Sequence, residues 1–145
     1  MLIRAGLGVF ALMLLSAPAF AANQCDASTP MAPAVPTPAQ ITAMSIPDAQ
    51  NKLNEVYKDL HLYQAQLKDY RACLSAAMNQ DQDKVNSAPA QKDPTIKKAA
   101  QDEYADYTAK FNATVDSEQS LASQINADAK AHCARDTTDF CKPKN

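Results

Sequence analysis

Glycine is nearly absent from this 145-residue chain, which contains only Gly6 and Gly8. Both lie in an apolar N-terminal run, so a chain that loses this run keeps no glycine. Phosphate-binding loops, dinucleotide-binding turns and nucleophile elbows need backbone conformations that only glycine tolerates. The sequence therefore argues against those classes of enzyme, and also against β-hairpins closed by Asn-Gly or Asp-Gly turns.

The apolar N-terminal run has the order of a cleavable export signal. Arg4 is the positively charged start, Leu7 to Leu15 form the hydrophobic segment, and Ala19-Phe20-Ala21 is a small-x-small cleavage site. We therefore predict that residues 1–21 are a signal peptide cut after Ala21. The mature protein is then expected to be periplasmic or secreted.

A surplus of positive charge is also missing. Without residues 1–21 the chain has 13 basic residues against 16 acidic ones, which gives a net charge of −3. Nucleic-acid binding depends on neutralising phosphates with Lys and Arg, so we expect no nucleic-acid partner. No later stretch approaches the ~20 apolar residues that a spanning helix needs, so we expect no membrane span in the mature chain.

A long helical periodicity is present instead. Ser45 is a favourable N-cap followed by Pro47, and Asp93-Pro94 starts a second helix after the break at residues 86–90. Apolar residues recur at alternating spacings of three and four, which is typical of a coiled-coil seam. We expect the buried stripes at Ile46, Ala49, Leu53, Val56, Leu60, Tyr63, Leu67, Tyr70, Leu74 and Ala77, and at Ile96, Ala100, Tyr104, Tyr107, Phe111, Val115, Ala122, Ile125 and Ala129.

The predicted fold is all-α. Because the connection between the long helices is short, residues 45–135 should form an antiparallel two-helix coiled-coil hairpin. Residues 22–44 are expected to be a Pro-rich arm with a short helix, and residues 136–145 a disulfide-closed tail. A three- or four-helix bundle is the alternative. In the hairpin the expected facing pairs are Leu53 with Ile125, Val56 with Ala122, Leu60 with Glu118, Tyr63 with Val115, Leu67 with Phe111, and Leu74 with Tyr104.

The arm has its own pattern. Pro30, Pro33 and Pro36 recur at every third residue, which is the repeat of a polyproline II helix. Thr37 and Gln40 then form a capping box around Pro38. The sequence therefore predicts a semi-rigid extended arm that ends in a short helix over 38–44.

Four cysteines allow three complete pairings, and the hairpin geometry separates them. Cys73 lies level with about residue 105 of the second helix, so Cys133 lies roughly 40 Å further along, far beyond disulfide reach. Cys141 can return at most about 28 Å over the tail, so it does not reach Cys73 either. We therefore predict Cys25–Cys73 and Cys133–Cys141, with the arm laid along one side of the hairpin. A Cys73–Cys133 bridge would indicate a broken second helix and a bundle.

No catalytic set is recognisable in the sequence. Cys-x-x-Cys, Ser-His-Asp and Cys-His arrangements are not apparent, so we predict a protein that is not an enzyme and has no catalytic, cofactor or metal site. We expect it to act by protein–protein contact, with another envelope protein or a second copy as partner. Tyr57, Arg71 and Met78 lie on one flank and are of types enriched at interfaces.

Two alternative functions stay open. The first is a periplasmic chaperone-like or inhibitor protein, which would also work by contact. The second is a metal or thiol-redox protein that uses Cys133, Cys141 and His132, because zinc takes Cys, His and carboxylate ligands. The nearby carboxylates available to such a site are those of Asp128, Asp136 and Asp139.

Overall fold

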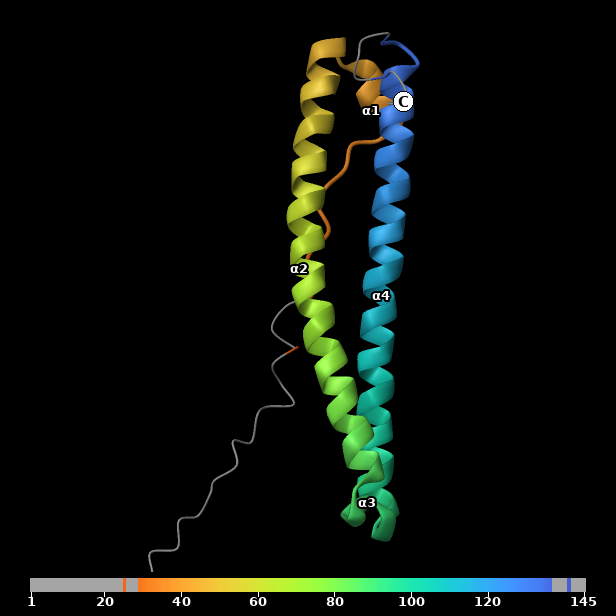
Figure 1. Ribbon diagram of the computed structural model, residues 1–145. Coiled ribbons are helices and arrows are strands. Elements are labelled where there is room, and N and C mark those ends of the chain that lie inside the picture. Colours follow the sequence, from red (N-terminus) through yellow and green to blue (C-terminus); the bar gives the residue numbers. More distant parts are fainter. Residues whose placement is uncertain (1–24, 26–28, 137–140, 142–145) are drawn as a thin grey trace, which may run out of the picture.

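The computed structural model describes Cys25, residues 29–136 and Cys141 (Figure 1). The predicted signal peptide and most of the predicted tail lie outside these residues. All regular structure in the described part of the chain is helical and no strand occurs there; its elements are α1 (Pro38–Ala43), α2 (Ile46–Asn86), α3 (Ala88–Lys92) and α4 (Pro94–Cys133). None of the helices in this part is long and apolar enough to cross a membrane.

The helices begin at the capping residues that the sequence predicts. Thr37 and Gln40 cap α1 reciprocally, with the Gln40 Oε1 atom 2.8 Å from the Thr37 backbone nitrogen. Ser45 caps α2 and Asp93 caps α4. In each case a proline follows in the first turn, where its missing N–H group leaves no helical hydrogen bond unmade.

The break between the long helices is shorter than predicted. Residues 86–90 were expected to be irregular, but Ser87 alone separates α2 from the one-turn helix α3. The Ser87 side chain accepts a hydrogen bond from the Ala90 backbone nitrogen, and Pro89 lies in the first turn of α3. The same residue therefore ends one helix and caps the next.

Helices α2 and α4 lie side by side and run in opposite directions (Figure 1). Gln50 near the start of α2 contacts His132 near the end of α4, while Lys84 near the end of α2 binds Glu103 at 3.0 Å. We call this unit the α2–α4 pair. Two long helices packed together are therefore the framework of the fold, as the sequence predicts.

The core of the α2–α4 pair is a narrow row of small clusters. Each cluster holds only a few fully buried side chains, because two helices enclose little volume. The buried residues of the clusters are Ile41, Ala49 and Leu53 at the end near α1; Val56, Tyr63, Leu67, Leu121 and Ile125 next to it; and Cys25, Leu74 and Tyr107 beyond the middle.

The N-terminal arm forms a third layer over part of the α2–α4 pair. The Cys25–Cys73 disulfide attaches it near the middle of α2, and the Thr29 hydroxyl lies 3.3 Å from the Tyr70 hydroxyl. Val35 then packs against the cluster around Leu67. In Figure 1 the arm (orange) follows the pair from there to α1, which lies at the end of α4.

Two of the predicted facing pairs are offset by two or three residues. Tyr63 was expected to face Val115, but its hydroxyl lies 3.0 Å from the Ser117 hydroxyl. Leu74 was expected to face Tyr104, but it shares a cluster with Tyr107. Val56 shares a cluster with both Leu121 and Ile125.

The predicted pairing of Leu60 with Glu118 is also wrong. Leu60 packs against the apolar cluster that contains Leu121, while Glu118 binds Gln64 and Arg71.

The predicted stripe of α4 is wrong at several positions for one physical reason. Ile96, Tyr104 and Val115 are exposed, while the polar Thr114 and Asp128 are buried. A stripe defined by apolar residues alone leaves out the buried polar residues. The predicted stripe is therefore rotated around the helix axis relative to the stripe that is buried. On α2, where most buried positions are apolar, the prediction fails chiefly at Ile46, which is exposed.

Candidate functional site

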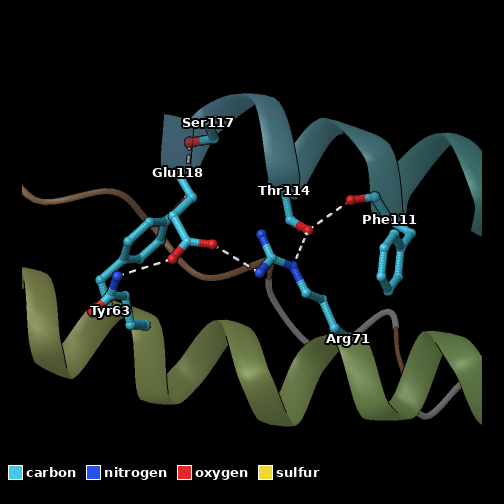
Figure 2. A network of polar contacts seen from close by, with 7 residues as sticks. Tyr63, Arg71, Phe111, Thr114, Ser117 and Glu118 are labelled. Atoms are coloured by element: carbon cyan, nitrogen blue, oxygen red, sulfur yellow. Dashed lines mark hydrogen bonds and ion pairs between the residues drawn. The ribbon is translucent and has the colours of Figure 1, made fainter. Parts of the chain in front are cut away.

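A network of polar side chains crosses the middle of the α2–α4 pair (Figure 2). The Arg71 Nε atom donates to the Thr114 hydroxyl at 2.7 Å, and its Nη1 atom donates to the Glu118 carboxylate at 2.8 Å. The guanidinium group also lies 5.9 Å from the centre of the Phe111 ring. We call Tyr63, Gln64, Arg71, Thr114, Ser117 and Glu118 the middle network.

The middle network compensates the charge of its carboxylate. Gln64 donates a second hydrogen bond to Glu118, at 2.9 Å. The Arg71 hydrogen bond, followed by that of Gln64, lowers the pKa of the Glu118 carboxyl below its usual range. A polar layer of this kind selects one alignment of two helices, because a shifted alignment would leave its charged groups without partners. The described contacts give the middle network a structural role.

A second polar group lies at the other end of the same pair, beside α1. Asp128, His132 and Asp136 follow one another at four-residue spacing, so the α-helical repeat places them on one face of α4 and its C-terminal turn. Their side chains are buried: Asp128 and His132 are 0% exposed and Asp136 is 5% exposed. With Gln50 and Cys141 they form what we call the end cluster.

Three kinds of donor atom converge in the end cluster. The His132 Nε2 atom lies 3.2 Å from the Gln50 Oε1 atom and 3.2 Å from the Asp136 Oδ2 atom. One donor atom from each of His132, Asp136 and Cys141 lies within 4.8 Å of the other two. The Cys141 sulfur is bonded to Cys133, so it is not a free ligand in this state.

Asp128 is the least compensated group of the end cluster. Neither of its carboxylate oxygens has a hydrogen-bond partner among the residues that the structure describes. Burial raises the pKa of this carboxyl above its ordinary value, because a charged carboxylate loses its hydration there without gaining a partner. Glu118 differs from Asp128 because its carboxylate accepts hydrogen bonds from both Arg71 and Gln64.

Arg135 holds α1 against the end of α4. Its guanidinium donates to the backbone carbonyls of Ile41 and Thr42 at 2.8 Å and of Met44 at 3.1 Å. These carbonyls lie at the C-terminal end of α1, where the Ile41 carbonyl also accepts a hydrogen bond from the Met44 backbone nitrogen at 3.3 Å. Helix α1 is therefore fixed where its Ile41 side chain is fully buried.

The cysteines are paired as Cys25–Cys73 and Cys133–Cys141, which are the two pairs that the sequence geometry favours. All four are used, so none is free.

The other residues named from sequence fall into three groups. His132 and Asp136 lie together with Cys141, whereas Asp139 lies outside the described residues. His61 is exposed. The suggested interface flank of Tyr57, Arg71 and Met78 makes contacts within the chain. Tyr57 and Met78 pack against core clusters, and Arg71 belongs to the middle network.

Sequence reasoning missed the partners that come from the facing helix. Gln50 and Gln64 carry no chemical signal in the sequence, because glutamine is common on solvated helix faces. The pairing of Arg71 with Glu118 could have been found from a correct alignment of the helices. An alignment based on apolar residues alone places Glu118 opposite Leu60.

An open cavity of about 520 Å³ lies between the arm, α1 and α2. Its lining is mostly apolar and contains one charged residue, Lys52, which pairs with Glu55 at 3.0 Å. The lining residues are Ala34, Val35, Pro36, Gln40, Ala43, Met44 and Lys52. No group that could act as a nucleophile or general base at neutral pH is among them.

No family model, curated protein or solved structure matches the chain. The described residues define its class by architecture: two long helices packed together, with two disulfides. Its function must therefore be argued from the end cluster and from the side chains that the helices leave exposed.

Proposed function

We propose that this protein is exported and works by protein–protein contact, as an antiparallel coiled-coil hairpin cross-linked by its disulfides. The observation that carries the proposal is the exposure of large apolar side chains on the two long helices. These are Leu62 (57% exposed), Ile96 (44%), Val115 (42%) and Tyr104 (40%). The proposal includes no catalytic step and no cofactor.

Exposed apolar residues on both long helices are the kind of surface that a second protein would cover. The α2–α4 pair already uses its polar groups internally, since Arg71 and Glu118 bind each other across it. Burying a fully exposed leucine or isoleucine side chain contributes about 1.5 to 3 kcal/mol, and side chains that are 40–57% exposed would each contribute roughly half of that. Four such residues therefore support binding to a partner protein or to a second copy.

The disulfides support the exported location. Two disulfides and no free cysteine are typical of a protein from an oxidising compartment. We propose that residues 1–21 are removed and that the mature chain is periplasmic or secreted. Mass spectrometry of the protein from the exported fraction should give an N-terminus at Ala22, whereas a retained residue 1–21 segment would contradict the proposal.

Photocrosslinking in cells tests the contact surface. A photoreactive residue in place of Leu62 or Val115 should capture one discrete species. The matched controls are Lys68 on α2 and Asn112 on α4, which are exposed polar positions of the same helices, and these should capture little. Equal capture from Leu62 and Lys68 would contradict the proposed surface.

The same experiment separates the possible partners. Capture of a single other protein indicates a fixed binding role, and capture of the chain itself indicates self-association. Capture of many unfolded proteins, together with suppression of aggregation of an unrelated protein, would indicate the chaperone-like alternative. Replacement of Leu62 by Glu should reduce any of these contacts while the helical circular dichroism signal stays unchanged, since Leu62 is mostly outside the core.

A further inference from the structure

We propose that the end cluster is a zinc site closed by the Cys133–Cys141 disulfide and opened by its reduction. The four ligands would be the sulfurs of Cys133 and Cys141, the His132 Nε2 atom and the Asp136 carboxylate. This set of two thiolates, one imidazole and one carboxylate is chemically suited to tetrahedral zinc. The inference is independent of the proposed contact surface, which lies on other residues.

The distances within the end cluster fit such a site. Zinc bonds of about 2.0 to 2.3 Å place the donor atoms of a tetrahedral site about 3.3 to 3.8 Å apart. The His132 Nε2 and Asp136 Oδ2 atoms are already 3.2 Å apart. One donor atom from each of His132, Asp136 and Cys141 lies within 4.8 Å of the other two. The Cys133 sulfur is bonded to the Cys141 sulfur but does not belong to this group of three, so it has to move toward the metal once the disulfide is broken.

The surroundings of these ligands favour a cation. Asp128 lies one helical turn before His132 on the same face of α4 and is fully buried, and within the described part of the chain neither of its carboxylate oxygens has a hydrogen-bond partner. A buried carboxylate without compensation lowers the energy of a positive ion placed near it. The Gln50 Oε1 atom lies 3.2 Å from the same His132 Nε2 atom that would bind the metal, so zinc replaces this contact and the Gln50 side chain has to move away.

The disulfide and the metal exclude each other because both use the same two sulfurs. A thiol reductant supplies two electrons and two protons, the Cys133–Cys141 bond breaks, and the reductant leaves as its own disulfide. Zn²⁺ then displaces the two thiol protons and binds both thiolates, His132 and Asp136. In the absence of zinc, a small-molecule disulfide reverses the first step: it accepts two electrons and two protons, leaves as two thiols, and the Cys133–Cys141 bond forms again.

Zinc titration of the full chain in its two redox states tests the proposal. The reduced protein, freed of reductant, should bind one Zn²⁺ per chain in competition with a chromophoric chelator. The oxidised protein should bind it more than about 100-fold more weakly, since two of the four ligands are then absent. Co²⁺ in place of Zn²⁺ should give thiolate charge-transfer and tetrahedral ligand-field bands only in the reduced protein.

Matched cysteine variants show which disulfide is responsible. The double variant C133S/C141S should lose zinc binding, whereas C25S/C73S should keep it, because its cysteines lie outside the end cluster. His132→Asn retains all four cysteines and should weaken binding by more than about 100-fold, which exceeds the roughly 10- to 100-fold effect of losing an outer partner alone. Circular dichroism verifies that each variant is folded before titration.

Three results would overturn the proposal. Failure of the reduced wild-type chain to bind Zn²⁺ would remove the site. Equal binding by the oxidised and reduced chains would remove the redox control. Retention of binding by C133S/C141S would place the metal on other residues.

Discussion

The middle network and the end cluster are both polar groups packed between the same two helices, but they compensate charge differently. In the middle network, Glu118 receives hydrogen bonds from Arg71 and Gln64, and the pKa of its carboxyl is lowered. In the end cluster, Asp128 receives none, and burial raises the pKa of its carboxyl. The first arrangement stabilises one alignment of the helices, whereas the second leaves a carboxylate that favours a cation or a proton.

The Cys25–Cys73 disulfide lies beside the middle network, and the Cys133–Cys141 disulfide lies in the end cluster. Removal of a disulfide is expected to change the free energy of unfolding more than any other substitution. Cys25–Cys73 ties the arm to the middle of α2 across 48 residues, while Cys133–Cys141 closes only 8 residues at the end cluster. From loop entropy we expect C25S/C73S to lower the free energy of unfolding by about 4 kcal/mol and C133S/C141S by about 2.5 kcal/mol. Urea unfolding of both variants measures the difference. A larger loss from C133S/C141S would reverse the ranking.

Removal of the arginine tests the compensation in the middle network. Arg71→Met leaves Glu118 without its main partner, and we expect a loss of about 2 kcal/mol in the free energy of unfolding. This is less than for a fully buried pair, because both side chains keep some exposure to solvent. The control is Lys98→Met, which breaks an exposed pair with Asp102 and should cost about 0.5 kcal/mol or less. Similar losses of unfolding free energy in the two variants would show that the Arg71–Glu118 pair contributes no more than an exposed ion pair.

The pH dependence should differ in sign between the two regions. The folded-state pKa of Asp128 is raised, so its contribution to stability is present below the unfolded pKa of about 3.9 and is lost as pH rises through the folded value. We therefore expect Asp128→Asn to raise the free energy of unfolding by about 1 kcal/mol at neutral pH, with no gain in acid. Urea unfolding across a pH series measures this, and an equal gain at every pH would contradict it.

Glu118 provides the matched comparison. Its folded pKa is lowered, so its contribution is present above the unfolded pKa of about 4.3 and is lost as pH falls through the folded value. Glu118→Gln should therefore reduce the loss of stability in acid, where Asp128→Asn has no effect. If the free energies of unfolding of the two variants changed with pH in the same way, the carboxylates of the two regions would not differ in charge compensation.

The smallest expected effect concerns a single hydrogen bond beside the middle network. Tyr63→Phe removes the hydroxyl that lies 3.0 Å from the Ser117 hydroxyl, while the buried ring stays in place. We expect a loss of about 0.5 to 1.5 kcal/mol in the free energy of unfolding. The double-mutant cycle with Ser117→Ala separates the interaction from other effects of each change. Full additivity of the two variants would show that the hydrogen bond contributes nothing.

Local chemistry made much of the fold predictable from sequence. Ser45 and Asp93 begin the long helices because their side chains cap free backbone N–H groups, and the following prolines fit only the first turn. The cysteine pairing also follows from sequence, because distances along helices of this length leave few bridges possible. Of the end cluster, His132, Asp136 and Cys141 could be named in advance as metal-ligand types. Gln50 could not, since it lies 82 residues away from His132.

The sequence by itself determined the two long helices and the residues at which they begin, because capping and backbone preferences act within a few residues. Only the tertiary structure decided which residues face each other. An apolar stripe can be aligned with its partner at several offsets of similar energy. The polar contacts of Arg71 with Glu118 and of Gln50 with His132 select one of them, and that choice places Thr114 and Asp128 inside and Val115 outside. Long-range pairing of polar groups therefore fixed the alignment that local patterns left open.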